Sequence, residues 1–249
     1  MRRNPVRTAP GRTDVAAEYG KSLIVHVDTS PGQRILDLGC GDGTLTAELA
    51  KNGAKVLGID NAPDMVVKAR VAHPDLMFAE IDALELPYDG EFDTVFSNSV
   101  FHWIPNVDHL LSEIRRALKP GGKLVCEFGA ASNLQTVRQA FAAACARHGH
   151  QYRERFYCPT PDEFFDRLKA AGFEPERVLE FDRQTPLPGE TDGLNLWIRR
   201  FLFRDLAAFS ASEQGQIIAE VEDACRPLLW NGTQFIVDYR RLRAVAFKK

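Results

Sequence analysis

The stretch RILDLGCGDGTLTAELAKNGAKVLGID, from Arg34 to Asp60, decides the fold. Its apolar start predicts a buried strand, and Gly39, Gly41 and Gly43 predict a tight turn into a helix. A second apolar run ends in Asp60, which predicts a second strand closed by a carboxylate. This order is one βαβ unit, in which a nucleotide-like ligand binds where the first strand turns into the helix.

The glycines and the carboxylate favour a ligand that contains adenosine. Glycine has no Cβ, so the backbone of the turn can bend sharply and approach a ligand closely. Asp60 follows the turn at about 20 residues, the spacing at which a carboxylate accepts hydrogen bonds from ribose hydroxyls. At this level the pattern fits any adenosine-bearing cofactor.

Acidic residues around the turn separate the candidate cofactors. Asp37 and Asp42 flank the glycines, and negative charge near a helix N-terminus weakens the binding of a pyrophosphate. Thr44 stands where a dinucleotide fingerprint has its third glycine. S-adenosylmethionine has a positive sulfonium and ammonium and no phosphate, so it suits this turn better than a nicotinamide dinucleotide.

DLGCGDG followed by GID resembles the first two cofactor motifs of the class I S-adenosylmethionine-dependent methyltransferases. The resemblance implies an α/β fold with a doubly wound, seven-stranded, mostly parallel sheet of Rossmann-like type and a helical cap. Tyr19 is either a lid residue over the cofactor or a core residue. The implied cofactor-binding residues are Tyr19, Asp37, Gly39, Cys40, Gly41, Asp60, Asn61, Met65, Asp82, Ala83, Leu84, Ser97 and Asn98.

The rest of the chain agrees with such a sheet. Strand and helix signals alternate from residue 34 to 130, which predicts parallel strands with ligands at their carboxyl ends. Asn106 and Thr160 are predicted helix caps, the latter with a capping box. The further predicted strands are Leu76 to Asp82, Glu91 to Ser99, Lys123 to Phe128, Val178 to Phe181 and Asp238 to Phe247, the last beside the fifth.

Composition limits the class of protein. The 249 residues are 45% hydrophobic and carry a formal net charge of −3, which predicts one domain and disfavours a nucleic-acid partner. Residues 1–12 are predicted to be a disordered arm and 13–249 a single domain, with cap insertions at about 131–158 and 185–232. The five cysteines show no CxxC spacing, so neither a disulfide framework nor a metal site is indicated. With no apolar run of membrane-spanning length, we expect a cytoplasmic monomer or homodimer that binds no membrane.

His102, in NSVFHWIP after the predicted fourth strand, is the candidate general base. An imidazole exchanges protons near neutral pH, and a base is needed if the acceptor must lose a proton. A structural role, with His102 bonded to backbone at a helix start, is the alternative. Trp103 beside it is the candidate wall of an acceptor pocket.

Other features concern the methyl acceptor. Ser97-Asn98-Ser99-Val100 replaces the Asn/Asp-Pro-Pro-Tyr/Phe turn of amino methyltransferases that act on adenine or glutamine, so a polymer nitrogen is disfavoured. Through LDLGCGDG, FHWIP, LKPGG, TPDEF and YRRLRAVAFK the chain is most similar to the small-molecule branch that contains trans-aconitate methyltransferase. That resemblance implies a small-molecule acceptor, methylated at oxygen, with a carboxylate as one option.

The insertion at about 185–232 has apolar residues at helical spacing, which predicts helices that form a substrate lid. Trp197 and Arg200 are its candidate acceptor-binding residues, because guanidinium groups bind carboxylates bidentately. Arg199, and Arg153 and Arg155 in the other insertion, are further candidates. A solvated surface charge is the alternative for each arginine.

Two other functions stay open from the residues alone. A nicotinamide-dependent oxidoreductase would use the same turn for a pyrophosphate. A catalytically inactive S-adenosylmethionine-binding regulator would have the same cofactor motifs but lack a residue that positions the nucleophile. Cofactor titration and turnover across an acceptor panel separate these functions.

Overall fold

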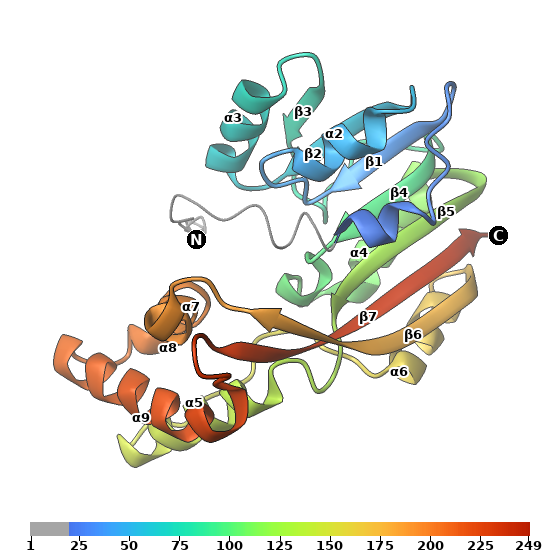
Figure 1. The fold of residues 1–249 in the computed structure, drawn as a ribbon. Coiled ribbons are helices and arrows are strands. Elements are labelled where there is room, and N and C mark those ends of the chain that lie inside the picture. The colour runs from blue at the N-terminus through green and yellow to red at the C-terminus, as the bar shows by residue number, and fades with distance from the viewer. Residues whose placement is uncertain (1–19) are drawn as a thin grey trace. The chain divides into compact units, whose positions relative to one another are not determined.

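The computed structural model describes residues 20–249 (Figure 1). The predicted arm at residues 1–12 and Tyr19 lie outside this range. In chain order the elements are β1 Arg34–Leu38, α2 Thr44–Ala50, β2 Lys55–Asp60, α3 Pro63–Ala72, β3 Met77–Glu80, β4 Phe92–Asn98, the 3-10 helix η1 Phe101–Trp103, α4 Val107–Ala117, β5 Leu118–Gly129, α5 Gln135–Arg147, α6 Pro161–Ala170, β6 Phe173–Pro186, the 3-10 helix η2 Glu190–Asp192, α7 Gly193–Phe201, α8 Phe203–Leu206, α9 Ala211–Leu229 and β7 Ile236–Lys248.

Seven strands form one sheet in the order β3-β2-β1-β4-β5-β7-β6. The neighbouring pairs from β3 to β5 are parallel, and β1 lies between β2 and β4. The predicted doubly wound, mostly parallel sheet is therefore confirmed, with the last strand beside the fifth. Ligands of such sheets bind at the carboxyl ends of the strands where the order reverses, which here is between β1 and β4.

The chain divides into two units. Within the described range, the first unit consists of residues 20–130, 156–180 and 242–249, and the second of residues 131–155 and 181–241. The first unit contains the βαβ stretch and its sheet neighbours. The second contains α5 and the helices from α7 to α9, so the predicted helical character of residues 185–232 is confirmed.

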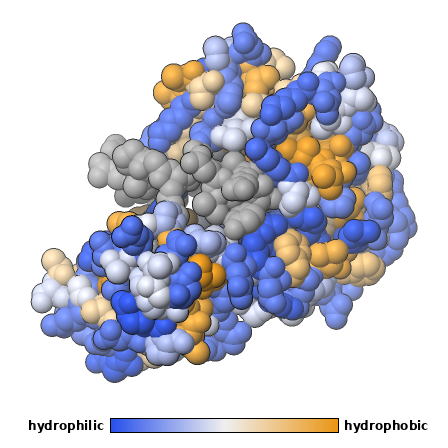
Figure 2. All heavy atoms as spheres, viewed as in Figure 1, coloured by the Kyte–Doolittle hydropathy of each residue, from blue (hydrophilic) through white to orange (hydrophobic). Residues whose placement is uncertain are grey.

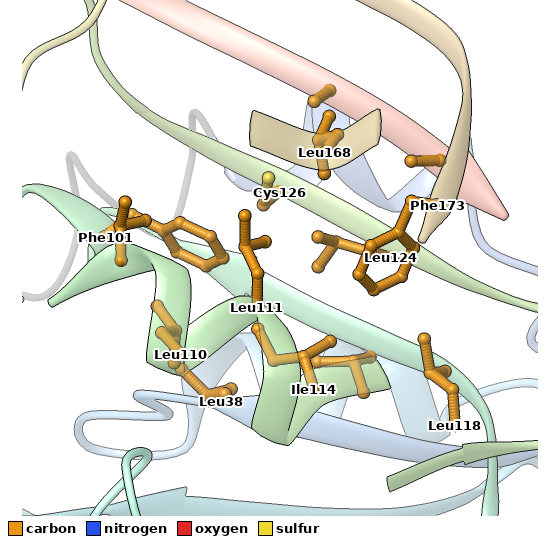
Figure 3. Close-up of a cluster of buried hydrophobic side chains, with 14 of the residues drawn as sticks. Leu38, Phe101, Leu110, Leu111, Ile114, Leu118, Leu124, Cys126, Leu168 and Phe173 are labelled. Atoms are coloured by element: carbon orange, nitrogen blue, oxygen red, sulfur yellow. The ribbon is translucent and has the colours of Figure 1, made fainter. Parts of the chain in front are cut away.

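One face of the sheet in the first unit is covered by α4 and α6. The apolar stripe of α4 is fully buried and packs with Phe164 and Leu168 of α6 and with Phe101 and Phe128 (Figure 3). Burial of each large aliphatic side chain contributes about 1.5–3 kcal/mol. The stripe is made of Val107, Leu110, Leu111, Ile114 and Ala117.

The opposite face is covered by the N-terminal side of the unit. Leu23 and Leu49 pack with Ile35, Val56 and Phe96 of the strands. Because both faces are covered by apolar side chains, the edge where the strands end is the part of this sheet left for a ligand.

A buried ion pair joins three segments of the first unit. Glu127 of β5 is 1% exposed, and its Oε2 accepts hydrogen bonds from Arg243 Nη2 at 2.6 Å and Nε at 2.9 Å. Arg243 also donates from Nη2 to the hydroxyl of Ser22 at 2.7 Å. The pair thereby attaches β7 and the segment around Ser22 to β5.

Local signals explain where several elements begin. The side chain of Asn106 accepts from the amide of His109, and Thr160 forms a reciprocal capping box with Glu163, as predicted. The sixth strand was predicted too short, as Val178 to Phe181. β6 is an edge strand with many half-exposed or exposed positions, so much of it lacks the apolar signal of a buried strand.

The surface viewed in Figure 2 is mostly hydrophilic, with hydrophobic residues gathered in separate patches. Among the large apolar side chains, Val25 and Val71 are 77% and 78% exposed. Within residues 20–249, no helix combines the length and the apolar character needed to cross a bilayer.

Candidate functional site

The glycine-rich turn is built from backbone conformations that favour glycine. Gly39, Gly41 and Gly43 have φ of 77°, 57° and 84°, in the left-handed region. The amides of Gly39 and Cys40 both donate to the carbonyl of Ile59, at 2.8 and 2.9 Å. The backbone of the turn is therefore attached to the end of β2.

Two of these glycines differ in their surroundings. A Cβ on Gly39 would lie 2.2 Å from Cγ2 of Val100, in the segment after β4. A Cβ on Gly41 would meet no atom within 4 Å among residues 20–249. Gly39 thus allows the segment after β4 to pack against the turn, whereas Gly41 presents its backbone to open space that a ligand can enter.

Asp60, the last residue of β2, holds the turn through its carboxylate. Its Oδ2 accepts from the amide of Gly41 at 3.0 Å, and its Oδ1 accepts from the amide of Ala62 at 2.9 Å. Burial raises the pKa of this carboxyl, and the two amides oppose the rise. Each carboxylate oxygen has a second lone pair, so additional bonds from ribose hydroxyls are compatible with this geometry.

Asp42 occupies the N-terminus of α2. Its Oδ1 accepts from the amide of Thr44 at 3.2 Å and from the hydroxyl of Thr44 at 2.9 Å. A carboxylate therefore already lies where a helix N-terminus would hold a phosphate. This contact supports the argument that the turn disfavours a pyrophosphate.

Asp37 does not supply the charge that the sequence argument assigned to it. Its side chain is 2% exposed, and Oδ2 accepts from the hydroxyl of Thr46 at 2.6 Å. Burial raises its pKa to about 7, so the group is partly protonated at neutral pH. Its observed role is to attach α2 to β1, and cofactor binding by Asp37 stays a prediction.

Cys40 and Ser97 are also buried rather than open to a ligand. Cys40 packs with Phe78 of β3, and burial raises the pKa of its thiol well above the ordinary value. Ser97 is 1% exposed and donates from its hydroxyl to the carbonyl of Leu38 at 2.9 Å. Any cofactor contact at these two positions would therefore come from the backbone.

The remaining predicted cofactor residues lie in the segments after β2 and β3, with Met65 in α3, and at the end of β4. The amide of Ile81 donates to the carbonyl of Asp60 at 3.1 Å, which brings the segment after β3 to the end of β2. In that segment Oδ1 of Asp82 accepts from the amide of Leu84 at 3.0 Å. Asn61 is exposed, and the partly buried members of the set are Met65, Asp82, Ala83, Leu84 and Asn98.

The segment after β4 contains a conformation that is uncommon outside glycine. Ser99 has φ of 64°, and its amide donates to the carbonyl of Glu127 at 2.7 Å. Left-handed non-glycine residues cost free energy and are found disproportionately at functional sites. This turn places Val100 against Gly39 and leads directly into η1, which carries His102 and Trp103.

An aromatic cluster, defined here as His102, Trp103 and Phe156, follows β4. The ring of Trp103 lies 4.9 Å from that of Phe156, edge to face, and the ring of His102 lies 5.2 Å from Trp103 and 6.2 Å from Phe156. The amide of Tyr157 donates to the carbonyl of His102 at 3.0 Å. Because Trp103 is 41% exposed, the cluster offers an aromatic surface beside an imidazole.

Phe156 was missed from the sequence. It is far from His102 along the chain, and the adjacent aromatics in RERFYCP were the sole local signal. Such a pair is more often core than site, so only the contacts within the folded unit identify it.

Trp197 and Arg200 belong to the second unit. Trp197 is 5% exposed, and its Nε1 donates to the hydroxyl of Tyr239 at 2.9 Å. Its side chain is therefore in the core of that unit, and its role in binding the acceptor stays a prediction. Arg200 lies with its guanidinium 5.2 Å from the ring of Phe201, and its binding role stays a prediction.

Known proteins share this chain's motifs and much of its length. A methyltransferase-domain family model matches residues 36–126. The ubiquinone biosynthesis O-methyltransferase of Cereibacter sphaeroides is 33% identical over 69% of this chain and 72% of its own length. The chain belongs to the class I S-adenosylmethionine-dependent methyltransferases. This family favours methyl transfer over the nicotinamide-dependent oxidation that the turn alone left open.

Two further comparisons extend over nearly the whole methyltransferase. An uncharacterized methyltransferase of Schizosaccharomyces pombe is 29% identical over 92% of this chain and 92% of its own length. A solved Bacillus halodurans structure, provisionally named as a methyltransferase, superposes with a TM-score of 0.66 at 20% identity and covers 92% of this chain and 97% of that one. At that identity the structure shows the shared fold alone.

The residues of the turn fit S-adenosylmethionine, the cofactor of this methyltransferase. The open space at Gly41 lies beside the Asp60 carboxylate, and Asp42 supplies a negative charge without a phosphate pocket. When bound, the cofactor supplies an electrophilic methyl carbon on a sulfonium. The protein's part is to orient an acceptor and exclude water, and to remove a proton where the acceptor carries one.

Proposed function

We propose that this methyltransferase methylates a hydroxyl oxygen of a small molecule with a planar, aromatic-like body. The supporting observation is the aromatic cluster, in which the imidazole of His102 lies beside the rings of Trp103 and Phe156. Aromatic rings stack on or pack edge to face with planar ligands. The relatives named as ubiquinone biosynthesis O-methyltransferases agree with oxygen as the acceptor atom.

His102 is the proposed general base in this reaction. A phenolic or alcoholic oxygen becomes a better nucleophile as it loses its proton, and an imidazole accepts protons near neutral pH. The cluster fixes the ring of His102 from one side through Trp103 and from another through Phe156, while its carbonyl is bonded to Tyr157. This arrangement supports an imidazole of fixed orientation at the exit of β4.

A carboxylate oxygen is the alternative acceptor, as in the trans-aconitate branch that the sequence resembles. A carboxylate has no proton to lose at neutral pH, so its methylation does not need His102. The cap role of the insertions at about 131–158 and 185–232, and acceptor binding by Arg200, stay predictions of the sequence. Cytoplasmic localisation and a monomeric or dimeric state remain predictions of the sequence.

The test is methyl transfer from labelled S-adenosylmethionine to matched phenol, carboxylate and amine acceptors, with cofactor affinity measured by calorimetry. We expect turnover of phenols, and we expect His102→Ala to lower kcat by about 10²–10⁴ with nearly unchanged cofactor Kd. His26→Ala is the matched control, because His26 lies in another part of the same unit. Log kcat should fall as the pH decreases through the range in which an imidazole takes up a proton, since the protonated ring cannot act as a base.

Two results would contradict the proposal. Turnover confined to amines or to carboxylates would show that a hydroxyl oxygen is not the acceptor atom. A His102→Ala enzyme with full kcat on a phenol would show that His102 is not the general base, while a hydroxyl oxygen would remain the acceptor atom.

A further inference from the structure

The second unit contains a cavity of about 340 Å³ lined by His150, Gln151, Arg153, Arg155 and Asp205. Four of these residues come from one short segment, and Asp205 comes from α8. A cavity of this size lies within the range of about 300–1,000 Å³ that is typical of small-molecule sites. Its lining includes two arginines and one aspartate, so cationic side chains outnumber anionic ones and an anion is the favoured ligand.

The segment at residues 150–155 is attached to α5 through two of its side chains. Tyr152 packs edge to face on Phe141 of α5, with ring centroids 5.4 Å apart, and Glu154 pairs with Nε of Arg138 at 2.5 Å. Gln151, Arg153 and Arg155, between and after them, line the cavity. Tyr152 and Glu154 thus attach this segment to α5, while Arg153 between them lines the cavity.

Both ends of the segment are also attached. The amide of His150 donates to the carbonyl of Cys145 at 2.9 Å, and its ring lies 5.2 Å from that of Phe209. At the other end, Arg155 Nε donates to Asp205 Oδ1 at 3.0 Å. The cationic side chains therefore extend from a backbone that is already ordered, which lowers the conformational entropy lost on binding.

The charges of the lining do not cancel. Two guanidinium groups face one carboxylate, and that carboxylate is paired with Arg155. Arg153 forms no ion pair or hydrogen bond with any residue of the described part of the chain. A planar guanidinium donates in parallel to two oxygens of a carboxylate or phosphate, and Gln151 and His150 can add neutral donors.

We propose that this cavity binds the acid group of a small molecule, a carboxylate or a phosphate, through Arg153. Arg155 is the second cation, and Asp205 orients it. The inference does not depend on the acceptor atom or on the base assigned above. It assigns a ligand class to the second unit, for which the cofactor motifs have no role.

The experiment titrates the full chain calorimetrically with citrate and, in a second arm, with inorganic phosphate, each at low and high salt. We expect saturable binding of at least one anion with a stoichiometry of one. Arg153→Gln should weaken it by about tenfold or more, since losing a charge-assisted hydrogen bond costs about 1.5–3 kcal/mol. Tighter binding of citrate would indicate a carboxylate ligand, and tighter binding of inorganic phosphate would indicate a phosphate ligand.

Arg147→Gln is the matched control, because Arg147 is an exposed arginine of the same unit whose guanidinium pairs with Glu220 and does not line the cavity. It should leave the anion Kd within about twofold. Equal weakening in the two variants, equal affinity of Arg153→Gln and the parent, or no saturable binding of either anion would overturn the proposal. S-adenosylmethionine titrated into the same samples reports separately on the cofactor site, so failure at one site is not mistaken for failure at the other.

Discussion

The glycine-rich turn and the aromatic cluster both belong to the first unit, yet they are assembled in different ways. In the turn, Gly39, Gly41 and Asp60 come from one continuous stretch and contact each other through backbone amides and one carboxylate. In the cluster, the side-chain rings of His102 and Trp103 contact the ring of Phe156, which comes from a distant part of the chain. The cofactor end is thus a backbone site and the proposed acceptor end a side-chain site.

This difference has a physical consequence for specificity. A backbone site depends on φ values and on the absence of Cβ atoms, so few residue types are compatible with it. A side-chain site tolerates exchange of one ring or apolar group for another, at a cost of about 1.5 kcal/mol or less in volume-conserving cases. One fold can therefore keep its cofactor while its acceptor changes.

The largest effect is expected from Gly39→Ala. The new Cβ would lie 2.2 Å from Val100 Cγ2, and φ at this position is 77°. The left-handed conformation costs about 1–2 kcal/mol and overpacking about 1–3 kcal/mol, so we expect a loss of about 2–5 kcal/mol in the free energy of unfolding. Urea denaturation measures this loss, and calorimetry should show cofactor affinity falling with it.

Gly41→Ala is the control that separates strain from contact. Its φ of 57° carries the same conformational cost, but its Cβ meets no described atom within 4 Å. We expect a loss of only about 1–2 kcal/mol in stability, together with a clear loss of cofactor affinity if the ligand occupies that space. Equal stability losses in the two variants would contradict the assignment of Gly39 to close packing against Val100.

The same difference explains how much could be predicted. The βαβ stretch, the alternation of strands and helices after it and the cap at Asn106 follow from local periodicity, glycine positions and capping chemistry, which act over a few residues. Phe156 could not be assigned, because a ring contact between distant segments leaves no periodic signal. Asp37 was misjudged for a related reason: a sequence shows that an acid is present but not that burial will raise its pKa.

An intermediate effect is expected from Phe156→Leu. The substitution removes the edge-to-face contact with Trp103, worth about 0.5–1.5 kcal/mol, while keeping an apolar side chain. If the cluster binds the acceptor, the acceptor KM should rise several-fold while cofactor Kd stays constant, because the turn shares no side chain with the cluster. Steady-state kinetics and calorimetry on the same preparation measure both.

Phe165→Leu is a suitable comparison for that variant, since Phe165 is 41% exposed on α6 and is not part of the cluster. A rise in acceptor KM for both variants would show that the effect is not specific to the aromatic cluster. A rise in cofactor Kd for Phe156→Leu would show that the cluster and the glycine-rich turn do not bind their ligands independently.

The last test concerns the buried carboxyl of Asp37, which accepts a hydrogen bond from Thr46 of α2. Asp37 has a pKa raised to about 7 in the folded protein, against about 3.9 in the unfolded chain. Between these values the folded state binds more protons, so the stability from this group is fully present below about pH 4 and is lost as pH rises toward 7.

Asp37→Asn keeps an oxygen that can accept from Thr46 but cannot titrate. Its free energy of unfolding, measured by urea titration of the cofactor-free protein from pH 4.5 to 8, should therefore fall less steeply with pH than that of the parent. Asp60, whose pKa is also raised, should leave a smaller slope of the same sign. Parallel pH profiles would show that Asp37 is ionised throughout, and its charge would then return to the argument for a sulfonium over a pyrophosphate.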